Sequence, residues 1–138
     1  MPVVGLSPSE WLAIITHVKK WVANLSRAKT ERKKQSNKAL RAVIKAVRQT
    51  KIYLRHLRDG GKKSIEKERK LSMLWTGLSF DLSDIGLKKL ADRCNSMGSY
   101  WADPAEFDEA FLNRAGNRLP DIEKLAEASL KDLENNSN

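Results

Sequence analysis

The chain contains a single cysteine, Cys94, among 138 residues. One cysteine cannot form an internal disulfide, and it cannot supply the cluster of thiolate and imidazole ligands that a structural zinc site needs. The only two histidines, His17 and His56, have no partner at metal-ligand spacing. We therefore expect a protein with no disulfide, no bound metal and no cofactor.

Long apolar runs are also absent, because no stretch approaches the ~18 consecutive apolar residues of a membrane-spanning helix. The N-terminus lacks the basic segment followed by an apolar segment that marks a secretory signal. These absences predict a cytoplasmic protein. Hydrophobic residues make up 41% of the chain, which is enough for one globular core. We expect a single domain over residues 1–133 and a frayed polar tail at 134–138.

Signals for β-strands are scarce. The β-branched residues recur at helical spacing, and the hairpin dipeptide Asn-Gly does not occur in the chain. Apolar residues instead follow the three- and four-residue spacing of amphipathic helices. The sequence therefore predicts an all-α fold, most simply an up-down helical bundle of four main helices with one or two short extra helices.

Capping residues and glycines indicate where helices begin and end. Residues 7–10 read Ser-Pro-Ser-Glu, which is a capping box for a first helix that ends near residue 26. A second helix follows Thr30 and runs without glycine or proline over residues 31–59, a length of roughly 40 Å. The Gly-Gly pair at 60–61 ends this second helix.

The second half of the chain has weaker boundaries. A helix begins at Ser64, but its apolar seam drifts, so residues 64–96 form either one bent helix or two. Gly98 is expected to end this segment. A short helix with an Asp-Pro start is expected over residues 103–116, where a glycine ends it, and a last helix covers residues 119–133.

The charge is unevenly distributed. The net charge of +9 comes from 26 Lys and Arg against 17 Asp and Glu. Residues 1–70 carry 19 basic and 5 acidic residues, a net +14, whereas residues 71–138 carry 7 basic and 12 acidic residues, a net −5. This asymmetry predicts a polyanion as partner of the first half. It also permits self-association, with the basic half of one copy on the acidic half of another.

The second predicted helix carries most of this charge in a regular pattern, which we call the basic stripe. Six of its cations follow spacings of four, three, four, three and seven, so that they align along one side of a helix. Acidic residues, which normally alternate with lysine on exposed helices, are nearly absent here. The stripe consists of Lys34, Lys38, Arg41, Lys45, Arg48 and Arg55, and it is widened by Lys33, Lys51 and Arg58. Such a stripe is typical of proteins that bind a phosphate backbone.

The turn after the stripe is a weaker anion-site candidate. Lys62 and Lys63 follow two glycines and precede a helix start, where free amides favour a phosphate. The alternative is an ordinary exposed turn between helices. Tyr53, on the stripe helix, either stacks on a base or packs against a neighbouring helix.

No arrangement of a nucleophile with a base, and no paired carboxylates, indicates catalysis. We expect a non-enzymatic nucleic-acid-binding accessory protein that contacts the backbone of DNA or RNA through the basic helix. The alternative is an assembly or adaptor subunit that forms a homo-oligomer or docks on an acidic protein. A membrane surface is not expected as partner, because the apolar seam of the basic helix is needed for the core. A helical enzyme would require a buried carboxylate pair near a cation.

Overall fold

The computed structural model describes residues 7–104 and 109–135. These residues form six helices and no strand, which confirms the prediction of an all-α helical bundle. The helices are α1 (Pro8–Ser26), α2 (Thr30–Gln35), α3 (Asn37–Arg58), α4 (Ile65–Asp84), α5 (Lys88–Ala102) and α6 (Glu109–Asn135). None of the helices in these two ranges is long and apolar enough to cross a lipid bilayer.

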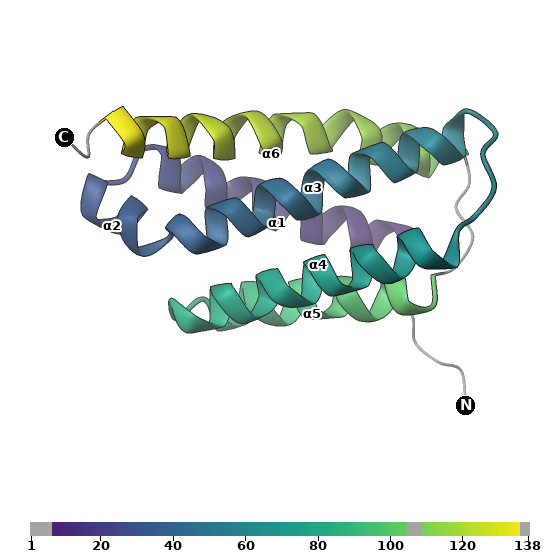
Figure 1. The fold of residues 1–138 in the computed structure, drawn as a ribbon, viewed down its shortest axis with the longest axis horizontal. Helices are drawn as coiled ribbons and strands as arrows, with labels where there is room; N and C mark the ends of the chain where they lie inside the picture. The colour runs from purple at the N-terminus through teal and green to yellow at the C-terminus, as the bar shows by residue number, and fades with distance from the viewer. Residues whose placement is uncertain (1–6, 105–108, 136–138) are drawn as a thin grey trace.

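The helices pack in two layers (Figure 1). The α4–α5 hairpin lies beneath a layer formed by α1, α3 and α6. Within the bundle, α3 packs against both α6 and α4, and α1 packs against α6 and α5. Three fully buried tryptophans, Trp11, Trp75 and Trp101, occupy the core. Trp101 makes edge-on contacts with Trp11 at 6.4 Å and with Tyr53 at 5.8 Å between ring centroids, and so joins α5 to α1 and α3.

Two helix starts follow from local capping. At the start of α1, the amide of Glu10 donates to Ser7 Oγ at 3.2 Å and the amide of Ser7 donates to Glu10 Oε1 at 3.3 Å. This arrangement is the predicted capping box. At the start of α4, the amide of Lys67 donates to Ser64 Oγ at 3.2 Å, so Ser64 caps the helix where the sequence predicted its start.

The prediction of a single long basic helix over residues 31–59 was wrong, because the helix breaks at Ser36 into α2 and α3. Ser36 is buried, and α2 turns to pack against α1 and α6. In α2, Lys33 points inward and its Nζ lies 2.5 Å from Asp132 Oδ2 of α6. Packing of this short helix across the end of the bundle therefore outweighs the good helix propensity of the segment.

Residues 64–96 form parts of two helices, which settles the alternative that the sequence left open. The turn between α4 and α5 contains Gly86 at a φ of 84°, a conformation that favours glycine. Gly98 does not end α5, contrary to expectation, because the helix continues to Ala102. The carbonyl of Gly98 accepts a hydrogen bond from Ser72 Oγ of α4 at 2.7 Å, so this glycine marks a close approach of two helices.

Gly116 and Pro120 were expected to separate two helices, but both lie inside α6. Residues on one face of α6 are buried on both sides of these positions, and they are Leu112, Ala115, Leu119, Ile122, Ala126 and Leu133. Burial of this continuous apolar face against α1 and α3 stabilises α6 by more than the loss of the backbone hydrogen bond at the proline costs. The expected start of the short helix falls partly in residues 105–108, outside the described residues. The expected tail is helical through Asn135, and its last three residues also lie outside the described part.

Candidate nucleic-acid interface

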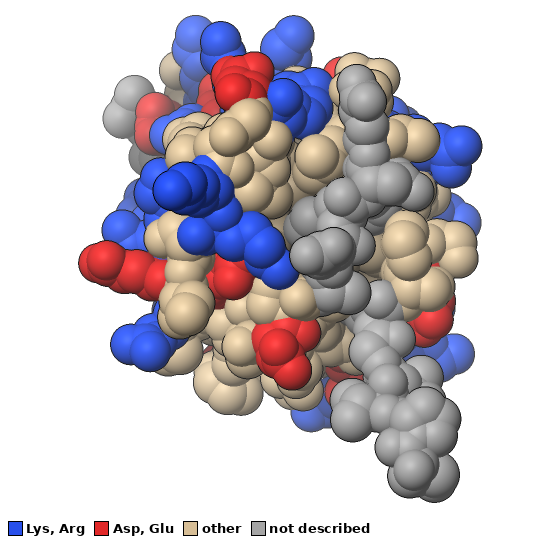
Figure 2. All heavy atoms as spheres, turned by 90° about the vertical axis from the view of Figure 1, so that its right-hand side faces the viewer, with Lys and Arg blue, Asp and Glu red and all other residues tan. Residues whose placement is uncertain are grey.

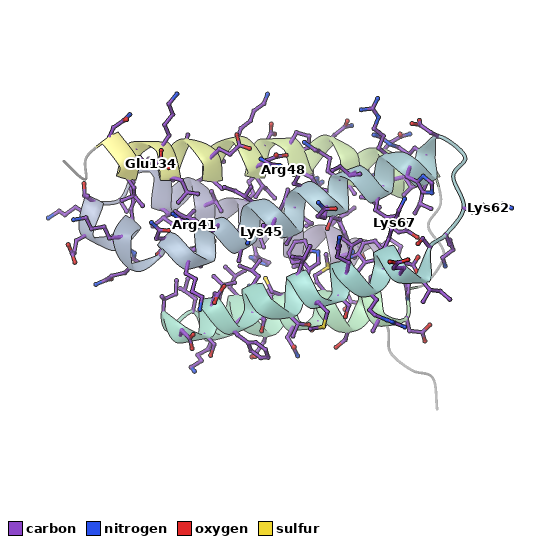
Figure 3. All side chains as sticks on the ribbon, in the orientation of Figure 1. Arg41, Lys45, Arg48, Lys62, Lys67 and Glu134 are labelled. Carbon is purple, nitrogen blue, oxygen red and sulfur yellow. The ribbon has the colours of Figure 1, made fainter. Side chains whose placement is uncertain are left out.

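Arg41 and Lys45 lie on the exposed face of the first half of α3. They are one helical turn apart, and both point away from the core in the space between α6 and α4 (Figure 3). The opposite face of α3 is buried through Leu40, Val43 and Val47, which fixes the orientation of the exposed side. Within the described residues, neither Arg41 nor Lys45 forms an ion pair. These two cations are therefore free to bind an anion.

A groove of about 250 Å³ runs between α3 and α4 beside these cations. Lys38, Arg41 and Lys45 line its α3 side, and Met73 and Gly77 lie on its α4 side. A Cβ atom at position 77 would have no neighbour within 4 Å, so the glycine leaves open space in the groove.

The acidic residue that lines this groove is Asp81, whose Oδ1 lies 3.6 Å from Lys38 Nζ. Lys38 is 84% exposed, and an ion pair of this length in water is weak. Basic side chains therefore dominate the groove.

Two further cations of α4, which the sequence prediction missed, do not line the groove but lie on the same side of the helix. Lys67 and Lys70 precede Leu74, Gly77 and Asp81 at spacings of three and four, which places all five on one side of α4. Both lysines are exposed, and Lys67 lies on the α4 side that faces α3 in Figure 3. The three-four spacing was visible in the sequence, but only the packing of α4 beside α3 joins these lysines to the stripe. We call the groove with its lining cations Lys38, Arg41 and Lys45, together with Lys67 and Lys70 on the same side of α4, the α3–α4 basic groove.

Arg48, in the middle of the stripe, is bound by two carboxylates of α6. Its Nε donates to Glu123 Oε2 at 2.6 Å and its Nη2 donates to Glu127 Oε1 at 2.7 Å. The other oxygen of Glu123 accepts from Lys51 Nζ at 2.5 Å. The hydrogen bond that Arg48 donates to Glu123, followed by the one it donates to Glu127, raises the pKa of Arg48. The stripe is therefore neutralised at Arg48 and Lys51.

Glu123 is the charged group that holds this cluster together. Its side chain is only 10% exposed. Burial by itself raises the pKa of Glu123, but the hydrogen bonds from Lys51 and Arg48 act in the other direction and outweigh it, so the pKa lies below its ordinary value. The carboxylate is therefore ionised at neutral pH, and it competes with any external anion for both cations.

Lys33 was predicted to widen the stripe, and the structure corrects this assignment. It is 6% exposed and paired with Asp132, so it cannot reach a ligand on the surface. The remaining stripe residues are exposed, but they lie apart from Arg41 and Lys45. Lys34 lies on α2, Arg55 Nε lies 3.9 Å from Asp59 Oδ2, and the Arg58 guanidinium rests against Gly116 of α6.

The turn between α3 and α4 is explained by structural contacts. Gly61 packs so closely on the His56 ring that a Cβ would overlap it, and the carbonyl of Lys62 lies 2.9 Å from His56 Nε2. The amide of Ser64 donates to Tyr53 Oη at 3.0 Å. These contacts favour an ordinary interhelical turn. Lys62 and Lys63 are exposed, and Figure 2 shows basic side chains interspersed with acidic ones at this end of the bundle.

Tyr53 packs inside the bundle and does not face the groove. It is 2% exposed, and its hydroxyl donates to Glu68 Oε2 at 2.5 Å. Burial, followed by this hydrogen bond, raises the pKa of Tyr53 to about 12. Base stacking by Tyr53 is therefore excluded, and the alternative of packing against a neighbouring helix holds.

The remaining candidates for chemistry are metal-ligating side chains and the single cysteine. In the described parts of the chain, no group of three or more His, Cys, Asp or Glu side chains is arranged to hold a metal ion. Cys94 is fully buried, and burial raises the pKa of its thiol to about 12, so the thiol stays protonated and unreactive. Comparisons of the chain with protein-family models, with curated proteins and with solved structures found no match.

Proposed function

We propose that this protein binds the phosphate backbone of nucleic acid in the α3–α4 basic groove. The observation that carries the proposal is the pair Arg41 and Lys45, exposed and without an ion pair in the described structure, at the rim of a groove that Lys38 also lines. Ordinary exposed helices neutralise such cations with acids one turn away. Leaving them free in a groove is useful when an external polyanion supplies the counter-charge.

The mechanism is neutralisation of backbone charge with release of condensed counterions. Tyr53 is buried, and the groove is lined by aliphatic rather than aromatic side chains beside its cations. Binding therefore depends little on base sequence. Lys34, Lys62 and Lys63 are secondary contacts at the two ends. Arg48 and Lys51 contribute only if the ligand displaces Glu123.

A charge-reversal pair tests the proposal against a matched control. Arg41→Glu with Lys45→Glu lowers the net charge from +9 to +5, because each change removes two positive charges. Lys124→Glu with Lys131→Glu makes the same change at two exposed positions of α6. Fluorescence anisotropy is measured with labelled duplex DNA, single-stranded DNA and RNA of one sequence.

The groove variant is expected to bind at least about tenfold more weakly than wild type at about 50 mM salt. The slope of its log affinity against log salt concentration is expected to be shallower by about two, because two phosphate contacts are lost. The α6 control is expected to lose much less affinity. Circular dichroism checks that both variants keep their helix content. The proposal fails if wild type binds none of the three ligands at low salt, or if both variants lose affinity equally.

A second candidate function is self-assembly through exposed apolar residues of α4, of which Met73 also borders the α3–α4 basic groove. Ile65, Met73 and Phe80 are 77%, 67% and 63% exposed, which is unusual for large apolar side chains. They are spaced almost symmetrically about Met73, so antiparallel pairing with a second copy would place Ile65 against Phe80 and Met73 against itself. Light scattering over a concentration series tests this candidate. A dimer that Met73→Glu dissociates supports it, and a monomer at every concentration excludes it.

A further inference from the structure

A second, larger pocket lies between α1 and the first half of α5. Its volume is about 690 Å³, within the usual range for small-molecule sites of roughly 300–1,000 Å³. Arg32 of α2 lies at one end, and residues 86–87 of the α4–α5 turn complete the lining. None of the residues that line it belongs to α3 or α4, so the pocket is separate from the α3–α4 basic groove.

The charged side chains that line this pocket are all basic. They are Lys20, Arg32, Lys88, Lys89 and Arg93. None of the five takes part in an ion pair within the described structure, although Lys88 Nζ donates a hydrogen bond to Ser83 Oγ at 3.0 Å. Five cations drawn from three helices around one hollow create a local positive potential, which an anionic ligand would relieve.

The start of α5 adds to this potential. Leu87 is the N-cap residue, and its apolar side chain makes no capping hydrogen bond with the first-turn amides that follow it. The first turn carries Lys88 and Lys89 and no acidic residue, which is the reverse of the usual preference at a helix N-terminus. An anion in the pocket would satisfy both the amides and the lysines.

The pocket also has an apolar wall with an aromatic ring. Trp21 and Leu25 of α1 line it, together with Ala28 from the α1–α2 turn, Leu87 from the α4–α5 turn and Leu90 of α5. The other three tryptophans are fully buried in the core, whereas Trp21 is only partly buried. A flat indole beside a group of cations can stack on a planar ring whose negative group reaches the cations.

We propose that this pocket binds a nucleoside phosphate, with the base against Trp21 and the phosphates among Lys88, Lys89 and Arg93. A simple inorganic anion would leave both the volume and the apolar wall unused. A ring system that carries phosphate matches the basic lining, the aromatic wall and the volume of the pocket together. The ligand is either a free nucleotide or the terminal nucleotide of a strand, because the two share this chemistry.

Isothermal titration calorimetry with ATP, adenosine and inorganic tripolyphosphate tests the proposal. Lys89→Ala with Arg93→Ala is expected to weaken ATP binding at least about tenfold, because two charge-assisted contacts to phosphate are lost. Lys124→Ala with Lys131→Ala, which removes the same charge from exposed positions of α6, is expected to bind ATP like wild type.

The base contact is tested by Trp21→Ala. This change is expected to weaken ATP binding about fivefold or more and to leave tripolyphosphate binding unchanged, because only ATP has a ring to stack. In wild type, ATP is expected to quench the fluorescence of Trp21, the one tryptophan that is not fully buried. The proposal is overturned if ATP does not bind, if tripolyphosphate binds as tightly as ATP, or if Lys89→Ala with Arg93→Ala has no effect.

Two further measurements separate the ligand sources and the two proposals. Arg41→Glu with Lys45→Glu is expected to bind ATP normally, so failure of nucleic-acid binding at α3 leaves the pocket proposal standing. On that variant, tighter binding of a 5′-phosphorylated oligonucleotide than of its 5′-hydroxyl form supports the pocket as a strand-end site. Equal binding of the two forms, together with ATP binding, supports it as a site for free nucleotides.

Discussion

Glu123 decides how much of the cationic face of α3 is available to a ligand. It accepts from both Arg48 and Lys51, and its carboxylate is nearly buried at the junction of α3 and α6. The same contacts stabilise the fold, because they hold two helices together through charge-assisted hydrogen bonds. At this one residue, stability and ligand binding therefore make opposite demands.

Replacing Glu123 with Gln is expected to destabilise the protein by about 1–2 kcal/mol at pH 7, because two cations lose their shared carboxylate. The folded-state pKa of Glu123 lies below its unfolded value, so its contribution is complete above the unfolded pKa of about 4.3 and is lost as the pH falls through the folded pKa. Urea unfolding at pH 7 and at pH 3 should therefore show a difference between Glu123→Gln and wild type that shrinks in acid.

The same variant gives a second readout. Because Arg48 and Lys51 are released, Glu123→Gln is expected to bind nucleic acid about threefold more tightly than wild type at low salt, despite its lower stability. Lower affinity in Glu123→Gln would contradict the placement of these cations beside the binding surface.

At the scale of elements, the α4–α5 hairpin depends on a close approach at Gly98. A Cβ at this position would overlap Thr76 Oγ1 and would lie 3.1 Å from the backbone carbonyl of Ser72. Gly77, also inside a helix, has open space where its Cβ would be. These two glycines therefore differ in whether packing requires them.

Gly98→Ala is expected to destabilise the fold by about 1–3 kcal/mol through overpacking. Gly77→Ala is expected to stabilise it by about 0.5–1 kcal/mol, because alanine has the higher helix propensity and meets no obstacle. Thermal and urea unfolding of the two variants measure both effects. Equal effects in the two variants would show that the hairpin has no close contact at residue 98.

At the scale of the whole molecule, the acidic second half of the chain folds onto the basic first half. Residues of α6 form ion pairs with α1, α2 and α3, namely Asp121 with Lys19, Asp132 with Lys33, and Glu123 and Glu127 with Arg48. The charge asymmetry is therefore partly compensated inside one molecule, which leaves fewer acids for the head-to-tail association that the sequence permits. Within the described residues, Arg41 and Lys45 of the α3–α4 basic groove and the five cations of the α1–α5 pocket are among those that no acidic residue of the chain pairs.

Because the folded chain keeps a net charge of +9, its uncompensated cations repel one another. Raising the salt concentration from about 50 mM to 500 mM is expected to stabilise the fold by about 0.5–1 kcal/mol, since screening weakens this repulsion. Urea, which carries no charge, is the suitable denaturant. In Arg41→Glu with Lys45→Glu, the salt-induced increase in the free energy of unfolding should be smaller. An increase equal to that of wild type would indicate a salt effect unrelated to these cations.

Several features of the fold follow from local sequence patterns. The capping box at Ser7 and the cap at Ser64 depend on contacts within four residues, and helical periodicity alone indicates the all-α class. Local signals failed where long-range packing opposed them. Ser36 breaks a segment of good helix formers, whereas α6 continues through Gly116 and Pro120 because its apolar face is buried along its whole length.

The candidate sites divide in the same way. The spacing of cations along residues 34–58 was sufficient to place Arg41 and Lys45 on one exposed side of a helix. Which of their neighbours stay free was decided by tertiary contacts between residues far apart in the chain, such as Arg48 with Glu123 and Lys33 with Asp132. The pocket beside Trp21 likewise exists only because α1 and α5 meet. Periodicity reports the direction of a side chain on its own helix, but the groups it meets depend on which helix faces pack together.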